Sequence, residues 1–106
     1  KSFENLWEFP GGKVKISETP ESALIREVNE ELGIGVEDSC LAPISFSSYS
    51  SDDFNLLVLL YICRIWDGIP ISMEGQIIKW VKVSELSGFA MPPANASFLT
   101  VLRDLL

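Results

Sequence analysis

The feature that most constrains this chain is one helix with clear start and stop signals, predicted over residues 20–32. Thr19 suits the N-cap position, and Pro20 suits the first helical position because the N–H that proline lacks would have no partner there. Glu21 places a negative charge near the positive end of the helix dipole. Gly33 then ends the helix. A glycine-rich loop, one helix and a stop therefore organise this part of the chain.

The predicted helix divides into an apolar arc and an acidic arc. The acidic arc holds Glu27, Glu30 and Glu31, and the neighbouring apolar arc holds Leu24, Ile25, Val28 and Leu32. Like charges three and four residues apart cost a few tenths of a kcal/mol each, so three carboxylates beside an apolar seam favour a cation between them. A solvated acidic face, the usual reason for charge on a helix flank, is the alternative interpretation.

Particular residue types recur at fixed spacing through this loop and helix. The seven fixed identities are Gly12, Glu18, Arg26, Glu27, Glu30, Glu31 and Gly33, and aliphatic residues stand at Val28 and Ile34. With average usage of about 7% per residue type, such a match arises by chance with a probability on the order of 10⁻⁸. The pattern resembles the Nudix box, the signature of the Nudix hydrolases.

Length and charge limit the kinds of partner. The 106 residues are enough for one domain, residues 1–106, and a modest core. With 15 acidic against 8 basic residues, the net charge of −7 would repel a nucleic-acid backbone, so no nucleic-acid polymer is expected as a partner. A single nucleotide carried by Mg²⁺ remains compatible, because the metal supplies the positive charge.

The chain contains no histidine, which excludes an imidazole metal site and a Ser-His triad and leaves the chemistry to carboxylates. Cys40 and Cys63 have no metal-site spacing and are interpreted as buried thiols of a reducing cytosol. The longest apolar run, 56–63, is far shorter than the roughly 20 residues of a membrane helix. We expect a cytoplasmic monomer with no membrane partner.

Hydrophobic patterning outside the helix predicts an α/β fold. From N- to C-terminus we expect a short strand over 7–9, an edge-like strand over 41–49, a central strand over 54–66 buried on both faces, a strand over 76–83, a turn with one helical turn over 84–91 and an amphipathic helix over 95–106. Pro43 marks the edge strand, because proline cannot donate to a ladder. The last helix should pack through Phe98, Val101, Leu102 and Leu105.

Three further segments resemble the MutT branch of the Nudix hydrolases, which clears oxidised guanine nucleotides: residues 6–13, 74–76 and 92–95. The resemblance implies a mixed sheet between helices and the hydrolysis of a nucleoside triphosphate to monophosphate and pyrophosphate, with 8-oxo-dGTP as substrate. Relatives have a first strand before this stretch, so the domain is expected to be N-terminally incomplete, with residues upstream of Lys1. Two alternatives stay open: another nucleoside-diphosphate-linked substrate, or a Nudix-like domain that binds a ligand without catalysis.

The resemblance also implies roles for individual residues. The Mg²⁺ or Mn²⁺ ligands would be the Gly11 carbonyl, Glu27, Glu30, Glu31 and Glu74. Either Glu27 or Glu74 would be the general base. Four residues would support the site: Gly12, Glu18, Arg26 and Gly33. Arg26 would hold a carboxylate in position.

Three residues are candidates for substrate binding. Phe9 would contact the base. Lys13 would touch phosphate, or is simply an exposed loop lysine. Asn95 would read the base through its amide, or would cap the last helix.

Overall fold

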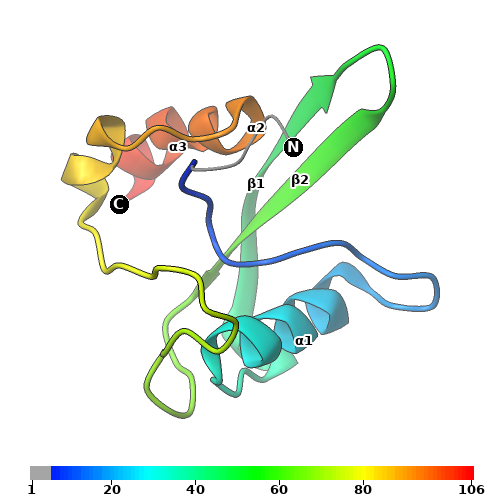
Figure 1. Cartoon of the computed structure of the whole chain (residues 1–106), viewed down its shortest axis with the longest axis vertical. Helices are drawn as coiled ribbons and strands as arrows, with labels where there is room; N and C mark the ends of the chain where they lie inside the picture. The colour runs from blue at the N-terminus through cyan, green and yellow to red at the C-terminus, as the bar shows by residue number, and fades with distance from the viewer. Residues whose placement is uncertain (1–5) are drawn as a thin grey trace. The chain divides into compact units, whose positions relative to one another are not determined.

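The computed structural model describes residues 6–106, and the expectation about Lys1 and what precedes it lies outside them (Figure 1). The elements are α1 (Pro20–Leu32), the 3₁₀ helix η1 (Asp38–Cys40), β1 (Leu41–Ser50), β2 (Asn55–Cys63), the 3₁₀ helix η2 (Val83–Gly88), α2 (Pro93–Ala96) and α3 (Phe98–Leu105). The chain forms two compact units. The α1 unit comprises Pro10–Pro43 and Tyr61–Lys79, and the C-terminal unit comprises Ile44–Leu60, Trp80–Leu106 and the N-terminal residues up to Phe9.

Helix α1 begins and ends where its sequence signals predict. Thr19 is the N-cap: its hydroxyl accepts a 3.0 Å bond from the backbone N–H of Ser22, and the Ser22 hydroxyl accepts one of 3.0 Å from the Thr19 N–H. This reciprocal pair satisfies two of the N–H groups that a helix start leaves unpaired. At the other end Gly33 adopts a left-handed φ of 71°, which a residue without a Cβ enters at little cost.

The apolar arc of α1 builds the core of its unit. Val28 and Leu32 are buried together with Ile34, just beyond the helix. The partly buried residues packed against them are Leu24, Val36 and Trp66. The acidic arc is left on the flank of this core, which fixes which way its carboxylates project.

The strands β1 and β2 form an antiparallel hairpin, and each contributes to both units. The turn between them is closed by the N–H of Ser51, which donates to the carbonyl of Phe54 at 2.9 Å. These strands confirm the predictions for 41–49 and 54–66, except that β2 ends at Cys63. The prediction that β2 is buried on both faces is wrong, since the side chain of Leu57 is 60% exposed. Within residues 6–106 only β1 pairs with it.

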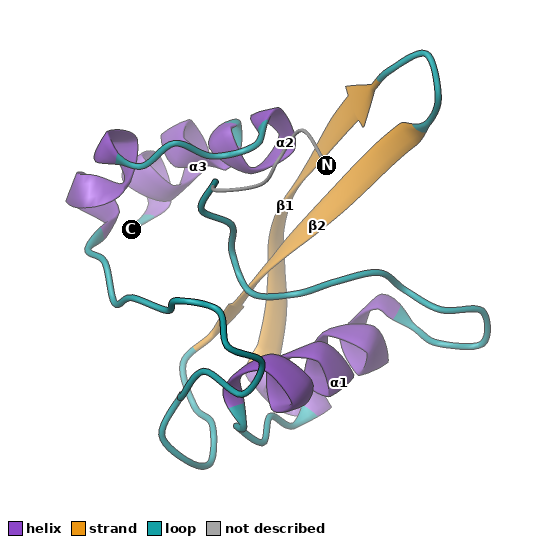
Figure 2. Cartoon of the chain, in the orientation of Figure 1, coloured by secondary structure: helices purple, strands orange, loops and turns teal. Residues whose placement is uncertain are grey.

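Two predicted strands are absent from residues 6–106, so the sheet there has two strands and is not mixed (Figure 2). Residues 7–9 are irregular because their N–H groups bond outside any ladder: Trp7 donates to the carbonyl of Ala90 and Phe9 to a side chain. Residues 76–82 are also irregular, and Ile77 is 81% exposed. The alternating apolar pattern of this segment is therefore not matched by burial.

The C-terminal unit ends in helical structure that differs in detail from the prediction. The predicted turn over 84–91 contains η2, and the predicted helix starts earlier and is divided at Ser97 into α2 and α3. The Ser97 hydroxyl bonds to the carbonyl of Ala94 at 2.9 Å and to the hydroxyl of Ser47 at 2.6 Å. Phe98 and Leu102 are buried as expected, whereas Leu105 is 61% exposed near the end of the last turn.

The predictions about the cysteine thiols and about membrane-spanning segments can be compared with the structure. Cys40 and Cys63 are free thiols, but both are half-buried and not buried as predicted. Among residues 6–106, no helix has both the length and the apolar character needed to cross a bilayer.

Candidate active site

Arg26 is the central contact of the acidic arc. Its Nε lies 2.7 Å from Glu18 Oε2 and its Nη2 lies 3.0 Å from Glu18 Oε1, a two-point contact that suits the planar guanidinium. Its Nη1 reaches Glu27 at 3.1 Å and Glu30 at 3.4 Å. Nη2 also donates to the carbonyl of Lys13 at 3.0 Å. One positive charge thus holds three carboxylates and ties the loop before α1 to the helix.

The same contacts set the ionisation of Glu18. The hydrogen bond from Arg26 lowers the pKa of Glu18 to about 2, and the backbone N–H of Lys15, 2.9 Å from Glu18 Oε1, acts in the same direction. The pKa of Arg26 is raised, chiefly by its bond to Glu18. Both groups are charged at neutral pH, so titration does not break this ion pair there.

The glycine pair before the helix lies directly against the acidic arc. Gly11 has a φ of 150°, and its N–H donates to Glu31 Oε1 at 3.4 Å. Gly12 lies so close to Glu27 that a Cβ at this position would overlap the whole carboxylate group. The close approach of the backbone to the helix explains why a glycine is needed at Gly12.

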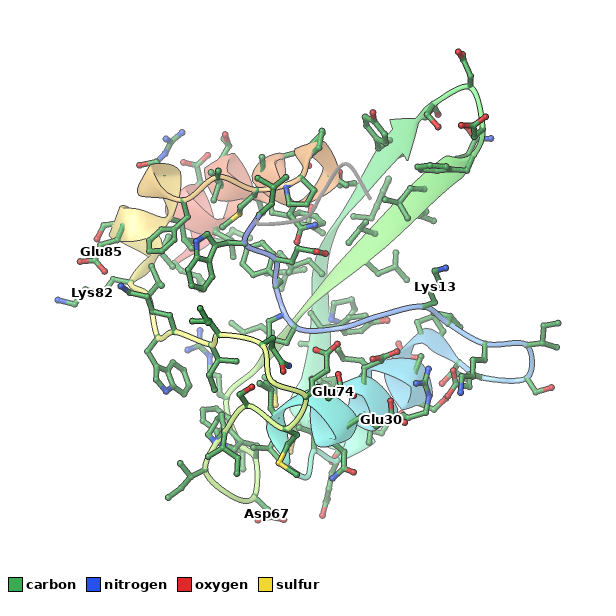
Figure 3. All side chains as sticks on the ribbon, viewed as in Figure 1. Lys13, Glu30, Asp67, Glu74, Lys82 and Glu85 are labelled. Carbon is green, nitrogen blue, oxygen red and sulfur yellow. The ribbon has the colours of Figure 1, made fainter. Side chains whose placement is uncertain are left out.

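The loop that carries Glu74 lies on the C-terminal end of α1. The N–H of Ile71 donates to the carbonyl of Leu32 and the N–H of Met73 donates to the carbonyl of Glu31, both at 3.0 Å. These bonds satisfy carbonyls that a helix end leaves unpaired. Figure 3 shows Glu30 and Glu74 at this end of the helix. The structure therefore brings Glu74 to the helix that carries the other predicted carboxylate ligands.

The carboxylates are near one another but do not form a finished ligand cluster. In the described part of the chain, no three acidic or thiol side chains converge in a way that would hold a metal ion. The guanidinium of Arg26 engages Glu27 and Glu30, and the N–H of Gly11 engages Glu31. The arrangement is an acidic face with its members held by protein donors.

A contact that the sequence analysis missed secures the other end of α1. The hydroxyl of Tyr61 in β2 donates to Glu21 Oε2 at 2.6 Å. This bond raises the pKa of Tyr61 to about 12 and lowers the pKa of Glu21. The available signal was a single hydroxyl-bearing residue in the apolar run over 56–63, since such a group in a strand usually has a hydrogen-bond partner.

Two of the three candidate substrate residues are joined in the C-terminal unit. The N–H of Phe9 donates to Asn95 Oδ1 at 3.2 Å. Asn95 lies inside α2 and is not an N-cap: that position is Pro92 in α2 and Ser97 in the last helix, α3, so the capping interpretation is wrong. Lys13, in the α1 unit, is exposed, and its carbonyl accepts the bond from Arg26 (Figure 3).

Comparison with known proteins identifies the family. Residues 1–103 match the family model described as the NUDIX domain. The chain belongs to the Nudix family. The spacing of Gly12 to Gly33 predicted this membership, and the match confirms it together with the expectation of a hydrolase.

Individual Nudix relatives are similar over most of the chain. The 8-oxo-dGTP diphosphatase of Escherichia coli is 35% identical over 101 residues, which are 95% of this chain and 77% of the relative. The protein of the same name from Proteus vulgaris is 60% identical over 71 residues, 67% of this chain and 62% of the relative. A MutT structure from a study of Aliivibrio salmonicida and Vibrio cholerae has a TM-score of 0.82 and 33% identity, covering 94% of this chain and 80% of that one. This similarity confirms the α/β Nudix fold.

Proposed function

We propose that this Nudix protein hydrolyses a nucleoside triphosphate to the monophosphate and pyrophosphate, with a divalent metal, and that its substrate is the oxidised guanine nucleotide 8-oxo-dGTP. One observation carries the proposal. Two carboxylates on one flank of the packed helix α1 lie against the glycine pair: Glu31 accepts from the N–H of Gly11, and Glu27 lies against Gly12. A purely solvated acidic face would need neither the close approach at Gly12 nor the Arg26 brace.

The donor groups on this face fit a hard cation. Carboxylate and carbonyl oxygens are the ligands that Mg²⁺ and Mn²⁺ prefer. The residues that would hold the metal are Gly11 through its carbonyl, Glu27, Glu30, Glu31 and Glu74. When bound, the metal would offset the charge of the phosphates and make a bound water more acidic. The names of the relatives, 8-oxo-dGTP diphosphatases, support the proposed nucleotide substrate.

The protein groups supply position and proton transfer. Arg26 and Glu18 orient the carboxylates, because the two-point contact between them fixes the guanidinium that also reaches Glu27 and Glu30. Either Glu27 or Glu74 accepts the proton of the attacking water. Lys13 contacts a phosphate oxygen from the loop before α1.

Phe9 and Asn95 contact the base. Oxidation at C8 converts N7 of guanine from an acceptor into an N–H donor, so an amide oxygen aimed at N7 gains a bond with the oxidised base only. Asn95 Oδ1 already accepts from Phe9, but a carbonyl oxygen has two lone pairs and can accept again. The oxidised base gains one hydrogen bond, and the ordinary base leaves a polar group of the site unpaired. Together these two effects give roughly tenfold to a few hundredfold selectivity for the oxidised nucleotide.

Steady-state kinetics on a nucleotide panel with Mg²⁺ tests the proposal. We expect kcat/KM to be highest for 8-oxo-dGTP, well above that for dGTP, and pyrophosphate to be released. Glu31→Gln should abolish turnover and leave the melting temperature of the metal-free protein unchanged or slightly raised, because a like-charge contact is relieved. Full activity of this variant, or of the wild type in excess chelator, would refute the metal mechanism. Preference for a nucleoside-diphosphate-linked compound, or binding without turnover, would refute the substrate assignment.

A further inference from the structure

The loop over 71–76 is held to α1 by a side chain as well as by its backbone. Gln76 Nε2 donates to the carbonyl of Glu31 at 3.3 Å, the carbonyl that also accepts from Met73. The other end of the same amide faces back into the loop, where Gln76 Oε1 accepts from the N–H of Glu74 at 3.1 Å and from the hydroxyl of Ser72 at 3.0 Å. One amide therefore links the helix end to the backbone of Glu74.

The turn beside Glu74 contains a glycine with open space around it. Gly75 has a left-handed φ of 82°, and apart from its two chain neighbours no residue has an atom within 4 Å of the place where its Cβ would be. A glycine loses more conformational freedom on ordering than any other residue, so a turn of this kind needs contacts that restrict it. The bond from the Glu74 N–H to Gln76 Oε1 spans Gly75 and supplies such a contact.

We propose that Gln76 is a positioning residue, which fixes Glu74 over the acidic arc of α1 and so prepares it to act on the metal or its water. The inference rests on the proposed function for the role of Glu74, and on the hydrogen bonds for the role of Gln76. The two ends of the amide have separate tasks: Nε2 docks the loop on the carbonyl of Glu31, and Oε1 orients the backbone of Glu74.

Two variants and one control separate these tasks. Gln76→Met keeps the length of the side chain and removes all three hydrogen bonds of the amide without adding charge. Gln76→Glu keeps the acceptor for the Glu74 N–H but replaces the donor to Glu31 with a carboxylate oxygen. Ser72→Ala is the matched control, because it removes only an exposed bond to the same Oε1 and leaves the contacts with Glu31 and Glu74 intact.

The first readout needs no turnover. In the metal-free protein, hydrogen exchange of the Glu74 amide should become roughly 2- to 10-fold faster in Gln76→Met, the range that follows from the net contribution of one hydrogen bond. It should stay close to wild type in Ser72→Ala. In Gln76→Glu the Glu74 amide should remain protected while the Met73 amide exchanges faster. Unchanged exchange of the Glu74 amide in Gln76→Met would overturn the proposal.

The second readout is Mn²⁺ affinity, measured by direct titration. Gln76→Met should weaken binding by roughly 2- to 10-fold in the wild type and have no further effect in a Glu74→Gln background, because the two changes then act on one interaction. An equal loss in both backgrounds, or Mn²⁺ affinity that Gln76→Met does not change, would overturn the positioning role. Mn²⁺ binding without hydrolysis of any nucleotide would instead refute the proposed function and leave the role of Gln76 supported.

Discussion

The close contact between Gly12 and Glu27 allows the acidic arc to be disturbed by a single methyl group. In Gly12→Ala the new Cβ would overlap the Cδ and both oxygens of the Glu27 side chain. The carboxylate must therefore move away from its present position, where its Oε2 lies 3.1 Å from Arg26 Nη1. The substitution displaces the carboxylate of Glu27 and leaves the Glu27 side chain itself chemically unchanged.

The cost in stability is small, because the atoms that must move are the end of a flexible side chain and not backbone. What is lost is the contact of Glu27, whose side chain is 17% exposed, with Arg26. An ion pair of this kind contributes roughly 0.2–1 kcal/mol, which corresponds to a fall in melting temperature of at most about 8 °C for a small domain. A displaced general base or metal ligand, in contrast, lowers kcat by roughly 10²- to 10⁴-fold.

The assay compares kcat and thermal unfolding of Gly12→Ala with those of Gly88→Ala. At Gly88 no atom lies within 4 Å of the position that a Cβ would take, so this variant should match the wild type in both measurements. A double-mutant cycle with Glu27→Ala follows: once the carboxylate is gone, the methyl group at position 12 should have little further effect. Wild-type kcat in a folded Gly12→Ala protein would refute the placement of Glu27 at the reacting centre, and an equal loss in the Glu27→Ala background would show that Gly12 acts through another group.

Three further predictions concern stability at acid pH, the C-terminal end of α1 and recognition of the nucleotide base. Glu18 has a pKa of about 2 in the folded state against 4.5 in the unfolded chain. Its contribution to stability is therefore present above about pH 5 and is lost as the pH falls toward about 2. In Glu18→Gln, the midpoint of urea unfolding should decrease less steeply with falling pH over that range. Gly33→Ala, at a left-handed φ, should lower the free energy of unfolding by roughly 1–2 kcal/mol in urea titrations, while Gly35→Ala, with only an ordinary contact near its Cβ, should not. Asn95→Ala should collapse the preference for 8-oxo-dGTP over dGTP in kcat/KM, and an unchanged ratio would remove Asn95 from base recognition.

The sequence predicted best what depends on neighbouring residues. Helix α1 needs only Thr19, Pro20 and Gly33 to set its ends and an apolar arc to bury one face, and all of these lie within a short stretch. The contact between Arg26 and Glu30 follows from the same periodicity, because residues four apart meet on one helix face. Fixed spacing also identified the family.

The failures concern segments whose structure is decided by distant partners. Residues 7–9 and 76–83 both alternate as a strand does, but alternation does not specify what the N–H groups will meet. At Phe9 the partner is the side chain of Asn95, 86 positions away, and at Gln76 the amide bonds to the end of α1. Such pairings leave no trace in a local pattern, so the roles of the individual site residues stay predictions until the variants above are measured.

Helix α1 is fixed at both ends by groups from beyond β1, and this arrangement explains how a helix of 13 residues can hold its carboxylates in place. Tyr61 bonds to Glu21 in the first turn, and the loop over 71–76 bonds to the last carbonyls. An isolated helix of this length is only marginally stable in water, because ordering its first turn costs more conformational entropy than the first hydrogen bonds offset. The side chains along its acidic arc repel one another and would loosen it further. The two attachments therefore oppose the destabilisation that a charged site imposes on the element that carries it.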